Sequence, residues 1–129
     1  MQHAPRYDDV VAEVRAFLSA RVKSAEEAGI SRQRMVVDPG FGFGKTIDHN
    51  LTLLKHLASF DDIGLPVMVG LSRKSMLGHI TGRGIKERVH ASVAAALLAA
   101  ERGARIIRVH DVRATKDALR VHEAVRNAC

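Results

Sequence analysis

The stretch Met35-Val36-Val37-Asp38-Pro39-Gly40-Phe41-Gly42-Phe43-Gly44-Lys45-Thr46 decides the fold. Its first three residues have the β-branched bias of a buried strand, and Asp38-Pro39-Gly40 ends that strand abruptly. In parallel α/β folds, ligands bind at the carboxyl ends of the strands. We therefore predict a ligand site at this turn.

Outward from this stretch, helical and extended patterns alternate along the chain. Apolar spacing and turn residues predict helices over residues 7–28, around 51–57, over 85–102 and from about 114 to 127, and strands over 35–37, 67–71 and 105–109. Strands that alternate with helices are joined by right-handed crossovers and so lie parallel. The predicted fold class is α/β, in the order α-β-α-β-α-β-α with three parallel strands.

Length and composition predict one domain over residues 1–129. The chain is 47% hydrophobic and 26% charged, and it has no apolar run of the roughly 18 residues that would span a membrane. Residues 1–5 carry no apolar signal core, and the single Cys129 excludes an internal disulfide. We therefore expect a cytoplasmic protein without a membrane partner.

The net charge of +6 suits anionic partners. Nucleic acid is one candidate, but aromatic residues make up only 4% of the chain and the basic residues are scattered, so there is no stacking platform for bases. The charge suits small anionic substrates equally well. We expect small-molecule substrates and no nucleic acid.

The glycine-rich turn nearly imitates a nucleotide-binding loop. A P-loop needs four residues between its first glycine and Gly-Lys-Thr, whereas Gly40 leaves three, and Pro39 occupies the required place. The dinucleotide fingerprint also fails, because Lys45 stands where its third glycine belongs. Two interpretations remain: a flexible turn with both phenylalanines tucked beneath it, or a loop that approaches a ligand with an exposed Phe as a wall.

Each predicted strand ends in a polar cluster: Asp38, then residues 72–75, then residues 108–111. Parallel strands bring their carboxyl ends to one edge, so these clusters are expected to converge. A carboxylate such as Asp38 can accept two parallel N–H donors from an aminopyrimidine edge, although it can also simply cap the Pro-Gly turn. The sequence therefore favours a ligand site over scattered surface charge.

The second and third clusters suit anions. Lys74 precedes Ser75, whose position at a helix start would offer free N–H groups, although solvated surface charge is the alternative. Arg108 and His110 are one residue apart, so they project to the same side and suit a phosphate or pyrophosphate. The remaining histidines show no zinc-ligand spacing.

Three ordered motifs closely resemble successive motifs of bacterial dihydropteroate synthase. They are Asp38 to Lys45, Gly70-Leu71-Ser72-Arg73-Lys74-Ser75 and Arg105-Ile106-Ile107-Arg108-Val109-His110-Asp111. The resemblance continues through the connecting helices and covers the whole chain. It implies that p-aminobenzoate is joined to a dihydropterin hydroxymethyl pyrophosphate, with release of pyrophosphate.

The resemblance also implies roles for individual residues. Asp38 and Lys74 would bind the pterin, and Phe43, Lys74 and Ser75 would line the aminobenzoate site. Arg108 and His110 would hold the pyrophosphate, while Arg108 also stacks on the pterin. The implied substrate-binding residues are Asp38, Phe43, Gly70, Lys74, Ser75, Arg108 and His110. Of these, Lys74, Arg108 and His110 are expected to carry catalysis.

The family fold is a (β/α)₈ barrel of about twice this length. The chain resembles its last three strands, so the first five would be absent, together with the asparagine associated with magnesium. The implied cofactor is Mg²⁺, with no metal ligand in this chain. An apolar inner face of Val36, Val69 and Ile107 would be uncovered, so the chain should be unstable or self-associating alone. The resemblance also implies a homodimer, formed through C-terminal helices. We expect a piece of a longer gene product with little activity alone; the alternative is a non-catalytic pterin-binding or assembly module.

Overall fold

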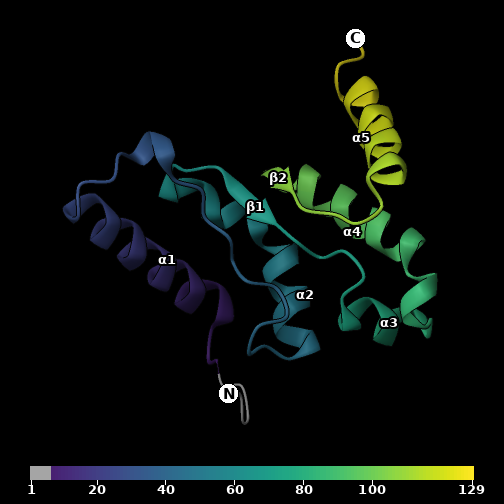
Figure 1. Cartoon of the computed structure of the whole chain (residues 1–129), viewed down its shortest axis with the longest axis horizontal. Helices are drawn as coiled ribbons and strands as arrows, with labels where there is room; N and C mark the ends of the chain where they lie inside the picture. Colours follow the sequence, from purple (N-terminus) through teal and green to yellow (C-terminus); the bar gives the residue numbers. More distant parts are fainter. Residues whose placement is uncertain (1–6) are drawn as a thin grey trace.

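The computed structural model describes residues 7–129. Figure 1 shows the helix α1 at one end of the long axis and α5 at the other, with two strands between them. The elements are α1 (Val10–Glu27), η1 (Arg32–Arg34), α2 (Ile47–Lys55), η2 (Leu57–Ile63), β1 (Val67–Val69), α3 (Ser75–Thr81), η3 (Ile85–Glu87), α4 (Val89–Glu101), β2 (Ala104–Ile107) and α5 (Val112–Arg126). Residues 1–5, whose sequence predicts no signal core, lie outside the described part.

The sheet in residues 7–129 consists of β1 and β2, which pair in parallel. Val67 lies opposite Ala104, and Met68 and Val69 lie opposite Ile106 and Ile107, with a register irregularity after Val67. The intervening α3 and α4 form the crossover that a parallel pair requires. The predicted α/β class with parallel strands is confirmed.

The prediction of three strands is wrong in the segment 35–37, which forms one parallel bridge, between Val37 and Val67, and no strand. Val37 donates its N–H to Pro66 O at 3.0 Å, and its carbonyl accepts from Met68 N at 2.8 Å. Pairing goes no further because Met35 N bonds back to Arg32 O in η1, and Pro39 has no N–H to donate. The segment nevertheless extends the sheet beside β1.

The hydrophobic core lies on the side of the sheet covered by helices. Val37, Val67 and Val69 contribute to it from the bridge segment and β1. Their partners come from α1, α2, η2, α3 and α4, and include Val14, Leu18, Leu53, Leu57, Phe60, Met76, Ala95 and Ala99. One continuous core therefore holds the extended segments against the helices.

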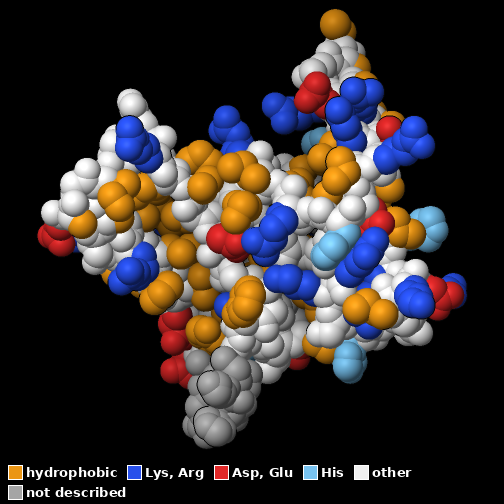
Figure 2. Space-filling view, viewed as in Figure 1, with side chains coloured by type: hydrophobic (Ala, Val, Ile, Leu, Met, Phe, Trp, Pro, Cys, Tyr) orange, Lys and Arg blue, Asp and Glu red, His pale blue; other side chains and the backbone are white. Residues whose placement is uncertain are grey.

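The other side of the sheet is its open face, which we define by Val36, Met68 and Ile106. Val36 is 46% exposed and Ile106 is 42% exposed, while Met68 is half-buried. Figure 2 shows hydrophobic side chains exposed across the middle of the molecule, beside a group of Lys and Arg side chains. The expected inner face is thus corrected: Val69 is fully buried against the helices, because residues alternate sides along an extended chain.

Helix ends differ from the sequence prediction where local capping decides them. α1 begins at Val10 and not at residue 7, because the Asp9 carboxylate accepts the N–H of Ala12 at 3.1 Å. The predicted helix over 85–102 is divided into η3 and α4, and the short α3 has no counterpart in the predicted order.

Among residues 7–129, no helix is long and apolar enough to cross a membrane.

Candidate functional site

The glycine loop (residues 38–45) is held by its own side chains and by α2. Asp38 Oδ1 accepts the N–H of Gly40 at 2.8 Å, as an acid before Pro-Gly commonly does. Lys45 Nζ donates to the carbonyls of Gly40 and Phe43, at 2.8 and 3.0 Å. On the α2 side, Asn50 Oδ1 accepts Gly42 N at 2.9 Å. Four hydrogen bonds between Asp38 and Asn50 therefore fix the loop.

The two phenylalanines of the glycine loop point in opposite directions. Phe41 is 1% exposed and belongs to the core, whereas Phe43 is 71% exposed. Gly42, between them, has a φ of 91°, which side-chain-bearing residues rarely adopt. The two interpretations left open by the sequence are therefore both partly right: one ring anchors the loop and the other forms a wall.

Lys74 reaches across from the end of β1 to this loop. Its ammonium group donates to the Phe41 carbonyl and lies 5.1 Å from the centre of the Phe43 ring, within cation–π range. Burial lowers the pKa of Lys74, and the positive charge of Arg108 lowers it further, while Asp38 opposes both effects. Burial and the charge of Lys74 likewise lower the pKa of Lys45. Asp38, Lys45, Lys74 and Arg108 thus form one electrostatic cluster.

Arg108 packs directly over Gly70. A Cβ atom built on Gly70 would lie 2.6 Å from Arg108 Nη2, so only glycine leaves room for the guanidinium in this position. The backbone of Arg108 donates to Val69 O at 2.9 Å, which continues the pairing of β1 with β2 beyond the last strand residue. The implied substrate residue Gly70 therefore acts here through the space it leaves for Arg108.

His110 is joined to the neighbouring strand end by Ser72. The Ser72 hydroxyl lies 2.8 Å from His110 Nδ1 and also accepts the His110 N–H at 3.1 Å. One hydroxyl therefore fixes both the backbone and the ring of His110. This contact leaves Nε2 as the nitrogen available to a ligand.

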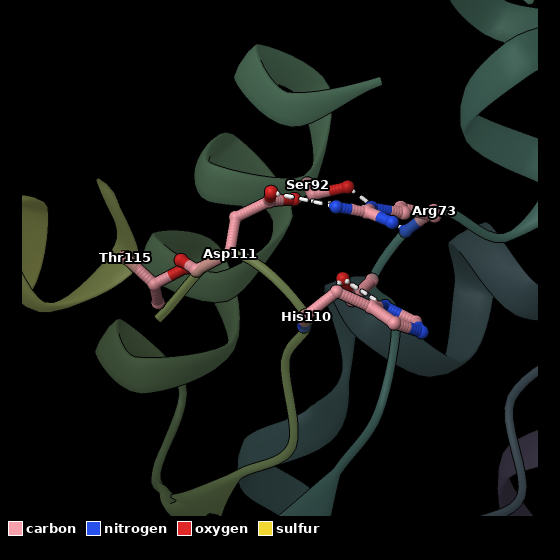
Figure 3. A network of polar contacts seen from close by, with 6 residues as sticks. Arg73, Ser92, His110, Asp111 and Thr115 are labelled. Carbon is pink, nitrogen blue, oxygen red and sulfur yellow. Dashed lines mark hydrogen bonds and ion pairs between the residues drawn. The ribbon is translucent and has the colours of Figure 1, made fainter. Parts of the chain in front are cut away.

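A second link between the two strand ends is the ion pair of Arg73 with Asp111 (Figure 3). The guanidinium donates through Nη2 to Oδ1 at 2.8 Å and through Nε to Oδ2 at 3.3 Å. This fork geometry is the strong form of an arginine–carboxylate contact. The hydrogen bond from Arg73 lowers the pKa of Asp111 below its ordinary value.

Replacing Arg73 by Gln is expected to raise the pKa of Asp111 back toward its ordinary value. A lowered carboxyl pKa contributes stability that is present above the unfolded-state pKa and lost as the pH falls through the folded-state pKa. As the pH falls, the native chain should therefore lose a contribution of the ionised Asp111 to its free energy of unfolding, and the variant lacks that contribution at any pH. NMR titration of the Asp111 carboxyl carbon measures this directly; equal midpoints in both chains would contradict it.

The structure brings together most of the residues predicted for the site. Asp38, Phe43, Lys74 and Arg108 converge on the edge of the sheet, with Gly70 beneath Arg108 and His110 held by Ser72. Ser75, which follows Lys74 in the chain, is the first residue of α3 and is exposed. The site therefore lies at the carboxyl edge of the sheet, where parallel strands that alternate with helices are expected to place it.

A cavity of about 380 Å³ lies on one side of the glycine loop, between it and α1. Asp38, Phe43 and Lys45 line it, opposite Phe17 of α1. Lys74, Arg108 and His110 are not among the residues that line this cavity. The acid Asp38 therefore faces both the enclosed space and the basic residues.

Sequence reasoning missed several residues that organise the site. Asn50 gave no signal because an amide within an amphipathic helix pattern looks like any surface residue, yet it is 3% exposed and also donates to Thr46 O. Lys45 ends the first of the three motifs, but nothing in the sequence indicates its bonds to the carbonyls of the glycine loop. Ser72 and Asp111 lay inside the recognised motifs, but nothing in their spacing indicated which side chains they would bond.

The comparison with protein families decides what kind of site this is. Residues 1–110 match the model described as pterin binding enzyme. The chain belongs to the pterin-binding enzyme family. A relative, the dihydropteroate synthase of Escherichia coli (strain K12), is 50% identical over 128 residues, which are 99% of this chain and 45% of that protein.

Solved structures with this family's fold agree over the whole chain. The dihydropteroate synthase of Stenotrophomonas maltophilia, with imidazole bound in its active site, gives a TM-score of 0.98 at 55% identity and matches 100% of this chain and 49% of its own. That of Xanthomonas albilineans in complex with 7,8-dihydropteroate gives 0.96 at 54% identity, with 100% and 50% covered. The chain thus spans about half the length of these pterin-binding enzymes. The resemblance drawn from the sequence motifs is confirmed.

The described residues do not form a metal centre. No group of three or more His, Cys, Asp or Glu side chains in residues 7–129 is arranged to hold a metal ion. Of the two acids near the cluster, Asp38 accepts from Gly40 and Asp111 is engaged by Arg73.

Proposed function

We propose that this chain forms part of a dihydropteroate synthase, which joins p-aminobenzoate to 6-hydroxymethyl-7,8-dihydropterin pyrophosphate in folate biosynthesis. The observation that carries the proposal is the convergence of Asp38, Lys74 and Arg108 at the carboxyl edge of the sheet. It is supported by the relative that binds 7,8-dihydropteroate, which contains both the pterin and the aminobenzoate moiety. The chain covers about half of that relative, so the activity belongs to a larger assembly of residues.

The pterin would be recognised by Asp38 and Lys74. The Asp38 carboxylate accepts the parallel N–H donors of an aminopyrimidine edge, and its second oxygen is free of the Gly40 contact. The Lys74 ammonium supplies donors for the pterin carbonyl and ring nitrogen. Because burial already lowers the pKa of Lys74, its charge is poorly hydrated and gains more from a ligand acceptor.

The aminobenzoate would lie against Phe43. This ring is exposed, and the Lys74 ammonium lies near its face, so an aromatic substrate can stack beside a positive charge that suits its carboxylate. Ser75, directly after Lys74, would add its hydroxyl and backbone N–H. Phe43 therefore separates a pterin side from an arylamine side.

Arg108 and His110 would hold the pyrophosphate. The bond between the methylene carbon and the bridging oxygen breaks, and the electron pair leaves with pyrophosphate. The arylamine nitrogen then bonds to the methylene carbon and loses a proton. Since the developing charge is on the leaving anion, fixed cationic donors lower the barrier without any protein nucleophile. Magnesium remains a prediction from the resemblance.

The proposal is tested by calorimetric titration of the chain with 6-hydroxymethylpterin. Asp38→Asn is expected to weaken binding by about tenfold, because the amide cannot accept two N–H donors. The matched control is Asp48→Asn, which removes the same charge from the exposed first turn of α2. Equal affinities for the native chain and Asp38→Asn would contradict the pterin assignment.

We also infer that the segment 35–37, β1 and β2 occupy adjacent positions in the wall of a (β/α)₈ barrel. Parallel pairing and helices on one face support this. The open face, with Val112, Val121 and Val125 exposed on α5, supports self-association or a homodimer.

A non-catalytic binding module is the alternative function. Such a module would bind the pterin but would not catalyse the release of pyrophosphate, even when the rest of the barrel is supplied. The cytoplasm stays the predicted compartment.

A further inference from the structure

Pairing between the two strand ends continues past the sheet through side chains. The strand-end segments are residues 70–74, after β1, and residues 108–111, after β2. Gly70 packs under Arg108, Ser72 bonds His110, and Arg73 forms the ion pair with Asp111. The three pairs have the same spacing along both segments: 70 with 108, 72 with 110 and 73 with 111. The basic residues of one segment are therefore held in register with those of the other.

Arg73 is the most constrained residue of the first segment. Its φ of 57° is the only positive value at a residue other than glycine in residues 7–129. Its N–H donates to Ser92 Oγ at 2.9 Å, and its carbonyl accepts from Arg88 Nη1 at 3.0 Å. Ser92 is 3% exposed in α4. Such a backbone conformation persists only where surrounding contacts impose it.

These contacts determine where Lys74 points. Lys74 follows Arg73 directly and is the N-cap residue of α3, so the turn at Arg73 sets the direction from which the Lys74 side chain reaches the glycine loop. Asp111 in turn follows His110 and precedes α5. The Asp111 side chain makes no capping hydrogen bond to α5, so its bonds in this structure are those to Arg73.

We propose that the Arg73–Asp111 ion pair is a positioning device that holds Lys74 in register with Arg108 and His110. This inference rests on the proposed function, because it concerns the distance between the pterin-binding lysine and the pyrophosphate-binding pair. An ion pair at the surface contributes little to stability on its own, but a forked pair within a network fixes geometry. In this proposal Arg73 and Asp111 act as positioning residues, through Lys74, Arg108 and His110.

The direction in which one substitution changes the affinity separates a positioning role from a simple effect of charge. Asp111→Ala removes a negative charge beside His110, so electrostatics alone would tighten the binding of 6-hydroxymethyl-7,8-dihydropterin pyrophosphate, which would contact Lys74 as well as Arg108 and His110. Positioning predicts the opposite, a weakening of about tenfold, because His110 and Arg108 lose their register with Lys74. Calorimetric titration of the chain with this dihydropterin pyrophosphate, in the absence of p-aminobenzoate, measures the change. Asp111→Glu, which keeps the charged fork, should restore most of the affinity.

Matched variants keep the result interpretable. Asp117→Ala removes the same charge from the exposed face of α5 and should not weaken binding. If far-ultraviolet circular dichroism shows that Asp111→Ala does not fold, the isosteric Asp111→Asn takes its place with the same expected direction. Unchanged or tighter binding by the folded Asp111 variant overturns the positioning role.

Arg108→Ala distinguishes this inference from the proposed function. Its loss of affinity for the dihydropterin pyrophosphate, together with weakening by Asp111→Ala, supports both. If Arg108→Ala weakens binding while Asp111→Ala does not, the anion site stands and the positioning role is overturned. If Arg108→Ala leaves the affinity unchanged, the proposed pyrophosphate site and the positioning role both fail.

Discussion

Replacing Lys74 by alanine is expected to weaken the binding of 6-hydroxymethylpterin by about 100-fold. The substitution removes charge-assisted donors to the pterin, each of which contributes about 1.5–3 kcal/mol. It also releases the Phe41 carbonyl and the contact with the Phe43 ring, which hold the glycine loop against β1. Calorimetric titration at neutral pH measures the loss, and an affinity within about threefold of the native value would contradict the role.

Lys74→Arg is the matched control, because it keeps the positive charge. The lowered pKa of Lys74 gives the comparison a pH dependence with a definite sign. As the pH rises, Lys74 loses its proton earlier than an ordinary lysine, so pterin affinity of the native chain should fall in the alkaline range. Arginine stays charged there. The Lys74→Arg chain should therefore lose less of its affinity than the native chain as the pH rises, and parallel profiles in both chains would contradict the assignment.

Phe41→Ala is expected to lower the free energy of unfolding by about 3–5 kcal/mol, the usual cost of deleting a buried aromatic side chain. The ring is 1% exposed and packs in the same core as Phe60 and Val69. Since small domains are stable by only about 5–15 kcal/mol, this is a large fraction of the total. Urea unfolding followed by circular dichroism measures the change in midpoint and slope.

Phe43→Ala provides a control only two residues away. Its ring is exposed, so the substitution should change the free energy of unfolding by no more than about 0.5 kcal/mol. It should instead weaken p-aminobenzoate binding, which Phe43 alone of the two rings can contact. Similar stabilities for the two variants would show that the loop is not anchored through Phe41.

The convergence of Asp38, Lys74 and Arg108 could be predicted from the sequence because it follows from topology. Alternation of helices and strands implies parallel strands, and parallel strands end at one edge. The prediction needed no side-chain detail, and it survives even though the segment 35–37 makes one bridge and no strand. What the motifs added was the identity of the family, which spacing alone left open.

The contacts that hold these residues could not be predicted in the same way. The roles of Asn50 and Ser92 depend on burial, and neither residue lies at a position where its type is diagnostic. The left-handed conformation of Arg73 runs against the preference of its own side chain, so no local propensity indicates it. Short-range patterns report the strands and helices, whereas these bonds join residues up to 38 positions apart.

The open face and the ligand site are built by the same three extended segments. Val36, Met68 and Ile106 precede Asp38, Gly70 and Arg108 by two residues each, so every ligand-facing position follows an apolar position on the same side of the backbone. Deleting or inserting one residue in a segment would exchange its two sides. The carboxylate or guanidinium would then turn into the helix layer, and a core valine would turn toward the ligand. Sequence length within these segments is therefore as strict a requirement for this site as residue identity.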